Sequence, residues 1–272
     1  MRIDVYLTQY GHAPSRARAQ QLIEAGKVTV DGTVVSKYSF SLDETLPHTV
    51  EIGEDIPYVG RGGCKLEAAL DAFGLDVKGA WALDIGASTG GFTDCLLRRG
   101  AARVYAIDSG SGQLAPALAQ DARVVNIEKC NARYLTPDLL GAEFEAHGGA
   151  DVIVMDVSFI SQTYIHPVFL SHLRRGGCVV TLIKPQFEVG REGLGKGGIV
   201  REPRFRRAAV DRVLESARVV GLTPVRVIPS PIEGGDGNLE YLALFEPTTE
   251  GVTPALTVED LPRELFAPRK TT

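Results

Sequence analysis

The sequence contains 272 residues, enough for about two domains. Hydrophobic residues make up 44% of the chain, so a substantial core is expected, whereas the formal net charge of −5 argues against a surface that binds polyanions over its whole extent. The four cysteines show no CxxC spacing and the five histidines show no metal-ligand spacing, which argues against disulfide bonds and metal sites. These features fit a protein of the reducing cytoplasm that binds no metal.

The N-terminal stretch MRIDVYLTQYGH lacks the character of a signal peptide, because Asp4 and Gln9 interrupt its apolar residues. The sequence has no run of about 18 apolar residues, so neither a membrane helix nor a membrane partner is expected. We therefore interpret the first residues as part of a folded unit.

The first 45 residues have the pattern of a small α+β unit. Apolar residues at near-helical spacing predict a first helix that ends at Gly11. A second helix is predicted from Ser15, a good N-cap, to Gly26. Alternating apolar residues around Asp31-Gly32 then predict a hairpin with a type I′ turn.

Charge is distributed unevenly in this region. Residues 1–40 carry five basic and three acidic side chains, an excess of two positive charges, whereas residues 41–55 carry five acidic side chains. The acidic stretch also contains proline and glycine, and we interpret it as a linker. We expect a first domain with its linker at residues 1–58, a second domain at residues 59–248, and a polar, mobile tail at residues 249–272.

From about residue 60 strand-like and helical segments alternate. Seven apolar runs resemble strands: WALDIG, ARVYAID, ARVVNIE, DVIVMDV, GCVVTLIK, PVRVIPS and LEYLALFE. The helical segments between them include TDCLLRRG, QLAPALAQ, YIHPVFLSHLRR and PRFRRAAVDRVLESARVVG. This alternation predicts an α/β domain with a doubly wound sheet. The short connection between the last two runs predicts an antiparallel hairpin at one edge.

A glycine-rich turn, DIGASTGG, follows the first of these strands. Ligands of open α/β sheets bind beyond the carboxyl ends of the strands, where glycines let the backbone come close. No lysine follows in the pattern of a nucleotide-phosphate loop, and the spacing between Gly86 and Gly90 does not match a dinucleotide fingerprint. Asp108 ends the second strand, 24 residues after Asp84, and could accept hydrogen bonds from ribose hydroxyls.

This turn therefore suits a nucleoside without a pyrophosphate, such as S-adenosylmethionine, whose cationic sulfonium a carboxylate such as Asp84 would attract. A turn without a ligand and a turn that binds NAD(P) remain the alternatives.

Four further stretches are YVGRGGCKLEAAL, VIVMDVSFIS, TLIKPQFEVGREGLGKGGIVREP and IEGGDGNLEYL. Together with DIGASTGGFTD they resemble the TlyA family, the haemolysin A-like or FtsJ-type ribosomal RNA methyltransferases. The first 45 residues resemble the S4 RNA-binding module. The resemblance implies a Rossmann-like methyltransferase domain whose seven-stranded sheet has an antiparallel last strand, preceded by a small S4-like domain. It also implies S-adenosylmethionine as the cofactor and structured RNA, in ribosomal RNA or ribosomal subunits, as the partner, with ribose 2′-hydroxyls of cytidines as the target.

The resemblance also implies site residues. By motif, the family's catalytic Lys-Asp-Lys-Glu tetrad falls on Lys65, Asp156, Lys184 and Glu240. The expected cofactor-binding residues are Asp84, Gly86, Ser88, Thr89, Gly90, Gly91, Phe92, Asp108 and Asp156. Taken singly, Lys65 would be a solvated surface residue and Glu240 an edge-strand charge. Asp156 and Lys184 follow predicted strands, so their side chains could meet above the sheet.

The chemistry gives a reason for such a cluster. A ribose 2′-hydroxyl is a poor nucleophile and must lose its proton as it attacks a methyl group. A neutral amine can accept that proton, but an isolated lysine has a pKa of about 10.4. A second cation and partial burial both lower a lysine pKa, and two carboxylates keep the cluster near neutrality. Either lysine could be the base, and the family analogy favours Lys184.

Basic residues predict two RNA contacts. The expected RNA-binding residues are Arg2, Arg16, Arg18 and Lys27 in the first unit and Arg201, Arg204, Arg206 and Arg207 in the second. Arginine forks suit phosphates, and such binding weakens steeply with salt. Because these patches lack interleaved aromatic residues, we expect the shape of the RNA to be recognised rather than its sequence. Solvated helix faces are the alternative.

The sequence argues against two other functions. A membrane-active haemolysin, as the family's older name suggests, conflicts with the missing signal peptide and membrane span. An RNA-binding protein without catalysis conflicts with the complete tetrad.

Overall fold

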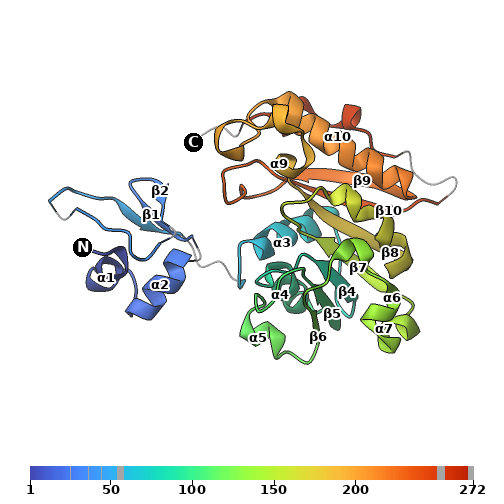
Figure 1. The fold of residues 1–272 in the computed structure, drawn as a ribbon, viewed down its shortest axis with the longest axis horizontal. Coiled ribbons are helices and arrows are strands. Elements are labelled where there is room, and N and C mark those ends of the chain that lie inside the picture. Colours follow the sequence, from blue (N-terminus) through green and yellow to red (C-terminus); the bar gives the residue numbers. More distant parts are fainter. Residues whose placement is uncertain (25, 36, 44, 54–57, 250–254, 269–272) are drawn as a thin grey trace. The chain divides into compact units, whose positions relative to one another are not determined.

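The computed structural model describes residues 1–24, 26–35, 37–43, 45–53, 58–249 and 255–268. Contacts within the chain define two compact units, Met1–Arg61 and Gly62–Thr272 (Figure 1). In the described residues, no helix combines the length and hydropathy that crossing a bilayer requires.

The first unit contains two helices and a three-stranded antiparallel sheet. Its elements are α1 (Ile3–Gln9), α2 (Arg16–Glu24), β1 (Val28–Val30), β2 (Thr33–Val34) and β3 (Val50–Ile52). The predicted helices are confirmed, and the Ser15 hydroxyl accepts a hydrogen bond from the Arg18 N–H at 3.2 Å. Asp31 and Gly32 have φ values of 51° and 76°, as a type I′ turn requires.

Part of the stretch interpreted as a linker belongs to this sheet. β3 pairs antiparallel with β1, with Thr29 opposite Glu51. Val50 and Ile52 are half-buried and pack against the unit's core. The number of acidic residues therefore wrongly indicated a linker at residues 50–52. Residues 44 and 54–57 of the expected linker lie outside the described residues.

The second unit is built on a seven-stranded sheet in the order β6-β5-β4-β7-β8-β10-β9. The strands are β4 (Trp81–Ile85), β5 (Arg103–Ile107), β6 (Val124–Ile127), β7 (Ala150–Met155), β8 (Leu173–Ile183), β9 (Leu222–Pro229) and β10 (Tyr241–Pro247). β6, β5, β4, β7 and β8 are parallel, while β10 runs antiparallel to both β8 and β9. The predicted Rossmann-like sheet, its antiparallel last strand and the edge hairpin are confirmed.

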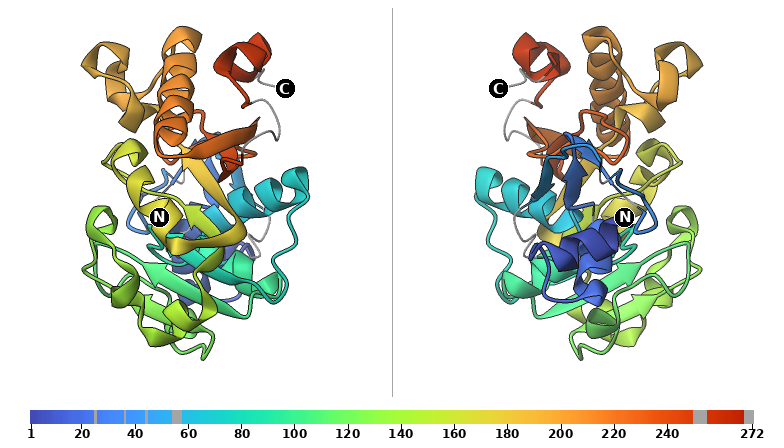
Figure 2. Two further views of the ribbon diagram at one scale, coloured as in Figure 1. Left: turned by 90° about the vertical axis from the view of Figure 1, so that its right-hand side faces the viewer. Right: turned by 90° about the vertical axis from the view of Figure 1, so that its left-hand side faces the viewer.

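Helices cover both faces of this sheet (Figures 1 and 2). The helices are α3 (Gly62–Phe73), α4 (Gly91–Arg98), α5 (Pro116–Ala119), α6 (Pro137–Leu140), α7 (Ala142–His147), α8 (Phe169–His172), α9 (Pro185–Glu188) and α10 (Pro203–Val219). Single 3₁₀ turns are η1 (Ala132–Tyr134), η2 (Gln162–Tyr164), η3 (His166–Val168), η4 (Arg191–Gly193), η5 (Lys196–Gly198), η6 (Val258–Asp260) and η7 (Arg263–Phe266).

The two faces follow from the alternation of side chains along each strand. Leu83 and Ile85 of β4 belong to one buried cluster with Val210 and Val213 of α10, and Phe144 of α7 joins them. α3 and α4 pack together on the opposite face.

One predicted helix is wrong. The segment YIHPVFLSHLRR forms the end of η2, then η3 and α8, and it continues as strand β8 from Leu173. Pro167 lies within η3, where it removes a backbone donor and thereby prevents a continuous α-helix.

The expectation of a mobile tail is also wrong for residues 255–268. Val258, Leu261 and Phe266 are buried in the same cluster as α10, although the segment looks polar overall. Three widely spaced apolar residues are enough to hold it, because backbone turns at η6 and η7 bring them onto one side. Residues 250–254 and 269–272 lie outside the described residues.

Candidate active site

Three of the four predicted tetrad residues lie at one edge of the sheet. Asp156 follows β7 and Lys184 follows β8, both at the carboxyl ends of parallel strands. Glu240 directly precedes β10, which runs the other way. Since Tyr241 is opposite Ile183 in this antiparallel pair, Glu240 comes next to Lys184 at the same edge.

The fourth residue, Lys65, reaches this edge from α3. A Cβ on Gly62, one helical turn before Lys65, would lie 3.8 Å from Asp156 Oδ2, so the first turn of α3 packs against Asp156. Lys65 Nζ donates to Glu240 Oε2 at 2.5 Å, and the two side chains are 8% and 2% exposed. The readings of Lys65 as a solvated surface residue and of Glu240 as an edge charge are therefore wrong.

Lys184 and Asp156 form a second ion pair. Lys184 Nζ lies 2.5 Å from Asp156 Oδ1 and donates a hydrogen bond to Ser158 Oγ at 2.8 Å. Both side chains are partly accessible, at 12% and 21%. The site thus contains one buried ion pair and one ion pair that is partly accessible.

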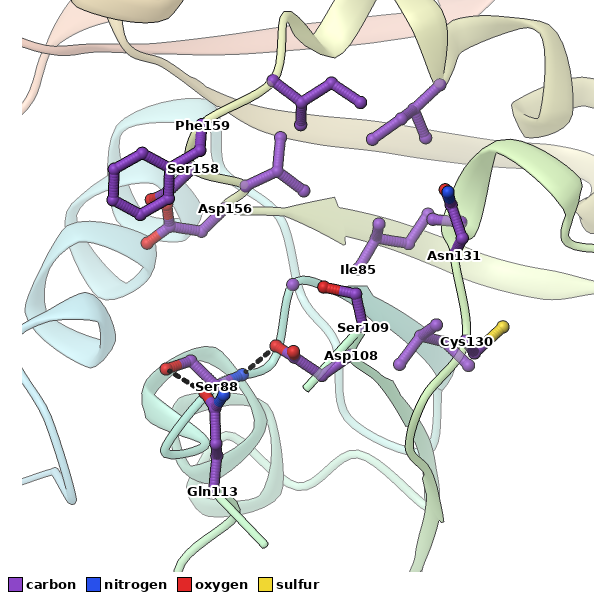
Figure 3. A pocket seen from close by; sticks show the side chains of 16 residues that line it. Ile85, Ser88, Asp108, Ser109, Gln113, Cys130, Asn131, Asp156, Ser158 and Phe159 are labelled. Atoms are coloured by element: carbon purple, nitrogen blue, oxygen red, sulfur yellow. Dashed lines mark hydrogen bonds between the residues drawn. The ribbon is translucent and has the colours of Figure 1, made fainter. Parts of the chain in front are cut away.

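A cleft of about 450 Å³ lies next to the accessible pair, at the end of the sheet where the strand order reverses between β4 and β7. This volume is in the range of small-molecule sites. Its lining residues are Ile85, Gly86, Ser88, Ile107, Asp108, Ser109, Gln113, Cys130, Asn131, Ala132, Asp156, Val157, Ser158, Phe159, Ile160 and Ile165. Figure 3 shows Asp156 and Phe159 at one end and Cys130 and Asn131 at the other.

The carboxylate of Asp108 is held in a fixed orientation inside the cleft. Its Oδ2 accepts a hydrogen bond from the Ser88 N–H at 2.8 Å, and its Oδ1 accepts one from the Gly110 N–H at 2.7 Å (Figure 3 shows the first). Each oxygen keeps a further lone pair, so the carboxylate can still accept a bond from a ligand hydroxyl.

Four of the predicted cofactor residues line the cleft: Gly86, Ser88, Asp108 and Asp156. Gly86 has φ +86°, and a Cβ there would lie 2.5 Å from the Asp156 carbonyl oxygen. Only glycine lets the turn after β4 come this close to the loop after β7.

The other predicted cofactor residues lie outside the lining of the cleft: Asp84, Thr89, Gly90, Gly91 and Phe92. A Cβ on Gly90 would meet the Leu118 side chain at 2.3 Å, and one on Gly91 would lie 3.0 Å from the Gly63 nitrogen. These two glycines thus permit close packing around α4. Phe92 is buried against the first turn of α3, and Thr89 is exposed.

Asp84 is fully buried beneath the turn. Thr93 Oγ1 donates to its Oδ2 at 2.7 Å, while its Oδ1 has no hydrogen-bond partner among the described residues. Burial raises the pKa of Asp84 to about 7, and the nearby carboxylates of Asp156 and Asp108 add to this rise. The turn therefore holds a carboxyl group that is costly to ionise in the free protein.

This raised pKa predicts a pH-dependent effect of Asp84→Asn. An acid whose pKa is raised by folding stabilises the folded state fully at pH values below its pKa in the unfolded chain. This stabilisation is lost as the pH rises through its pKa in the folded protein, which is about 7 for Asp84. Between pH 5 and pH 8, the free energy of unfolding of the wild type should therefore fall by about 2–3 kcal/mol relative to that of Asp84→Asn, which has no ionisable group at this position. Urea denaturation at several pH values measures this gain. The exposed Asp138→Asn is the control, and a constant difference for Asp84→Asn would refute the prediction.

Glu188, at the end of α9, is a buried residue that the sequence patterns did not reveal. Its Oε2 accepts a hydrogen bond from Ser161 Oγ at 2.5 Å, and its Oε1 accepts one from the Gln162 N–H at 2.9 Å. Burial raises the pKa of Glu188. Because Ser161 follows Asp156 and Glu188 follows Lys184, this carboxylate ties together the two loops that carry the accessible ion pair.

The predicted RNA contact at Arg206 is wrong. Arg206 is 3% exposed, and its guanidinium donates to the carbonyl oxygens of Val200, Arg201 and Phe266. The arginine therefore anchors the C-terminal segment to α10. Its position on a helix that looks polar concealed this role.

The other predicted RNA contacts are at least partly exposed. On α10, Arg204 pairs with Glu202 at 2.8 Å and Arg207 pairs with Glu259 at 3.2 Å, while Arg201 lies exposed before the helix. Neighbouring carboxylates therefore offset part of the positive charge expected here.

In the first unit, the side chains of Arg2 and Arg16 are 45% and 56% exposed. Both bond to the fully buried carboxylate of Asp4, at 3.0 Å and 2.9 Å. Asp4 thus holds two half-exposed guanidinium groups, from the start of α1 and from α2, in fixed positions.

The strand order, the antiparallel β10 and a cleft at the switch point define a Rossmann-like α/β methyltransferase domain. Residues 58–246 match the FtsJ-like methyltransferases and residues 1–45 match the S4 domain. The chain belongs to the FtsJ-like methyltransferase family, within which it is similar to the TlyA proteins.

Similar proteins cover nearly the whole chain. The 16S/23S rRNA (cytidine-2′-O)-methyltransferase TlyA of Mycobacterium tuberculosis is 42% identical over 95% of this chain and 94% of its own. Hemolysin A of Brachyspira hyodysenteriae is 43% identical over 90% of this chain and 99% of its own. A solved structure from Streptococcus thermophilus that carries the hemolysin name is 41% identical, with a TM-score of 0.71 over 91% of this chain and 88% of that one.

Proposed function

We propose that this enzyme transfers a methyl group from S-adenosylmethionine to the 2′-oxygen of a ribose in structured RNA, at cytidines of ribosomal RNA. The observation that carries the proposal is the Lys184–Asp156 pair at one end of the cleft, where an amine can meet a substrate hydroxyl. The M. tuberculosis relative, named as a cytidine-2′-O ribosomal RNA methyltransferase, supports the choice of substrate. A ribosomal substrate would place the enzyme in the cytoplasm.

The cleft residues fit S-adenosylmethionine. Asp108 would accept hydrogen bonds from the ribose hydroxyls, and Ser88 and Gly86 would form the wall beside it. Asp84 is fully buried outside the lining of the cleft, so it would support the turn rather than contact the ligand. When bound, S-adenosylmethionine supplies an electrophilic methyl group.

Lys184 would remove the proton from the attacking 2′-hydroxyl. The reacting form of this side chain is the neutral amine, which becomes an ammonium as it takes the proton of the hydroxyl. Asp156 and Ser158 orient the nitrogen from two sides and so hold it beside the cleft. The buried pair of Lys65 and Glu240 would keep the first turn of α3 and the start of β10 fixed around it.

RNA would be held by both units. We propose residues 1–58 as an S4-like domain with its linker, residues 59–248 as the methyltransferase domain and residues 249–272 as a C-terminal segment. Arg2 and Arg16, preoriented by Asp4, would bind phosphates, as would Arg18 and Lys27. Arg201, Arg204 and Arg207 would add contacts in the second domain.

Methyl transfer from labelled S-adenosylmethionine to purified ribosomal RNA tests the proposal. A 2′-O-methyl group blocks alkaline cleavage of the adjacent phosphodiester, so the label should appear in alkali-resistant dinucleotides that contain 2′-O-methylcytidine. RNA binding without label would favour a non-catalytic RNA-binding protein. Leakage of liposomes with no label in RNA would favour a haemolysin.

Glu188→Ala should lower kcat by about 10²-fold. Without the Glu188 carboxylate the two loops are no longer joined, and a displacement of Asp156 and Lys184 by up to about 1 Å is enough for such a loss. Glu188→Gln should recover part of this loss, since its amide oxygen can still accept from the Gln162 N–H. Steady-state kinetics with saturating cofactor measure both variants. Glu192→Ala, an exposed acid in the same loop region, is the control, and normal turnover of Glu188→Ala would disprove the positioning role.

A further inference from the structure

Two exposed tyrosines flank an arginine beside the cleft. Tyr134 is 69% exposed and Tyr164 is 54% exposed. The Arg133 guanidinium lies 5.6 Å from the ring centroid of Tyr134 and 4.9 Å from that of Tyr164. We refer to these three residues as the tyrosine–arginine stack.

The stack stands next to the proposed site of methyl transfer. Arg133 and Tyr134 belong to η1, directly after Asn131 and Ala132, which line the cleft. Tyr164 belongs to η2 and lines a second, open hollow. Phe159 and Ile160 line both the cleft and this hollow, so the two cavities adjoin along the loop that follows Asp156.

The hollow has its own positive charge and aromatic surface. Its walls include Tyr164, Phe187 and Arg212, together with the neutral Gln186. No carboxylate is among its lining residues in the described part of the chain. A polyanion with aromatic groups matches this combination, whereas an acidic wall would repel it.

Stabilisation of the fold is a weak explanation for these rings. A cation–π contact at an exposed site contributes only about 0.5–1 kcal/mol, and more than half of each tyrosine faces water. Stacking of unpaired bases on aromatic rings and arginine planes is a common means of binding single-stranded nucleic acid. Arg133 and the two rings, contributed by two separate loops, offer such a surface.

We propose that the tyrosine–arginine stack binds unpaired nucleobases of the RNA strand adjacent to the methylated ribose. This inference rests on the proposed function, because it requires RNA at the neighbouring cleft. It also revises the expectation that RNA shape alone is recognised, since aromatic and basic residues do alternate at this rim. The two tyrosines would bind by stacking, and Arg133 would add both a planar face and a positive charge.

The double variant Tyr134→Ala/Tyr164→Ala tests the inference in the full-length protein. Its KM for RNA should rise about 5- to 100-fold, the range for losing one stacked base, while kcat at saturating RNA stays within about twofold. Binding of S-adenosylmethionine, measured by calorimetry, should not change. Tyr134→Phe/Tyr164→Phe keeps the rings and should restore the wild-type KM.

Two further measurements separate stacking from charge and from folding. Arg133→Gln should reduce the slope of log affinity against log salt by about one, whereas the tyrosine variants should leave that slope unchanged. Leu139→Ala and Val219→Ala, at residues that are 54% and 84% exposed in the same unit, are the controls and should behave as wild type.

A wild-type KM for RNA in the double tyrosine variant, with methylation intact, would overturn the inference and leave the proposed function standing. A fall in thermal stability together with lost cofactor binding would also overturn it, because the rings would then be structural. Absence of RNA methylation by the wild-type enzyme would instead remove the proposed function and this inference with it.

Discussion

Replacing Lys184 with alanine is expected to lower the rate of methyl transfer by about 10²- to 10⁴-fold, the usual contribution of a general base. Lys184 Nζ, held by Asp156 and Ser158, is the group that we expect to accept the proton of the 2′-hydroxyl. Single-turnover transfer of labelled methyl groups measures the chemical step directly.

Cofactor binding gives the comparison that this prediction needs. Calorimetry should find a near-normal Kd for S-adenosylmethionine in Lys184→Ala, because the Lys184 side chain lies outside the lining of the cleft. Lys196→Ala, an exposed lysine in the loop after α9, is the matched control and should keep full activity. Retained turnover in Lys184→Ala would show that another group removes the proton.

The second large effect is expected at the buried pair of Lys65 and Glu240. Either Lys65→Ala or Glu240→Ala leaves a charge without a partner at a position that is less than a tenth exposed. The free energy of unfolding should fall by about 3–5 kcal/mol in each single variant. Urea denaturation followed by circular dichroism measures the loss.

A double replacement distinguishes charge burial from loss of packing. Lys65→Met/Glu240→Leu removes both charges and keeps apolar volume, so it should be more stable than either single variant. Glu143→Ala, which breaks an exposed pair with Arg103, should cost less than about 1 kcal/mol. Single variants at Lys65 and Glu240 as stable as wild type would contradict the structural role of this pair.

Local sequence patterns were sufficient for most of the fold. The seven strands were predictable because each is a short apolar run bounded by turn residues, and their alternation with helices predicts a doubly wound sheet, although it does not determine the strand order. Local patterns failed in segments whose structure is determined by one or a few residues. Pro167 breaks an apparent helix, and in the C-terminal segment Val258, Leu261 and Phe266 are too far apart to form a recognisable apolar run.

The motifs pointed to the four residues that the fold brings together at this edge, but they did not predict how these residues pair. Lys65 and Glu240 are 175 positions apart, and only the folded sheet brings them together. Glu188 was missed for the same reason, since its partner Ser161 lies 27 positions earlier. Arg206 looked like a surface cation because no local pattern reveals that carbonyl oxygens from distant turns surround it.

The far wall of the cleft could have been anticipated. Cys130 and Asn131 follow β6 as Asp108 follows β5, and carboxyl ends of neighbouring parallel strands share one edge of a sheet. The same rule that selected Asp108 therefore applied one strand further along the sheet.

Nucleoside mass spectrometry of ribosomal RNA tests the central claim most directly. The host strain would lack its own copy of this gene and carry either the wild-type gene or the Lys184→Ala variant, expressed at equal levels. If the Lys184–Asp156 pair beside the cleft performs ribose methylation, 2′-O-methylcytidine should increase only with the wild-type gene. An unchanged amount with the wild-type gene, or an equal increase with both, would contradict the account.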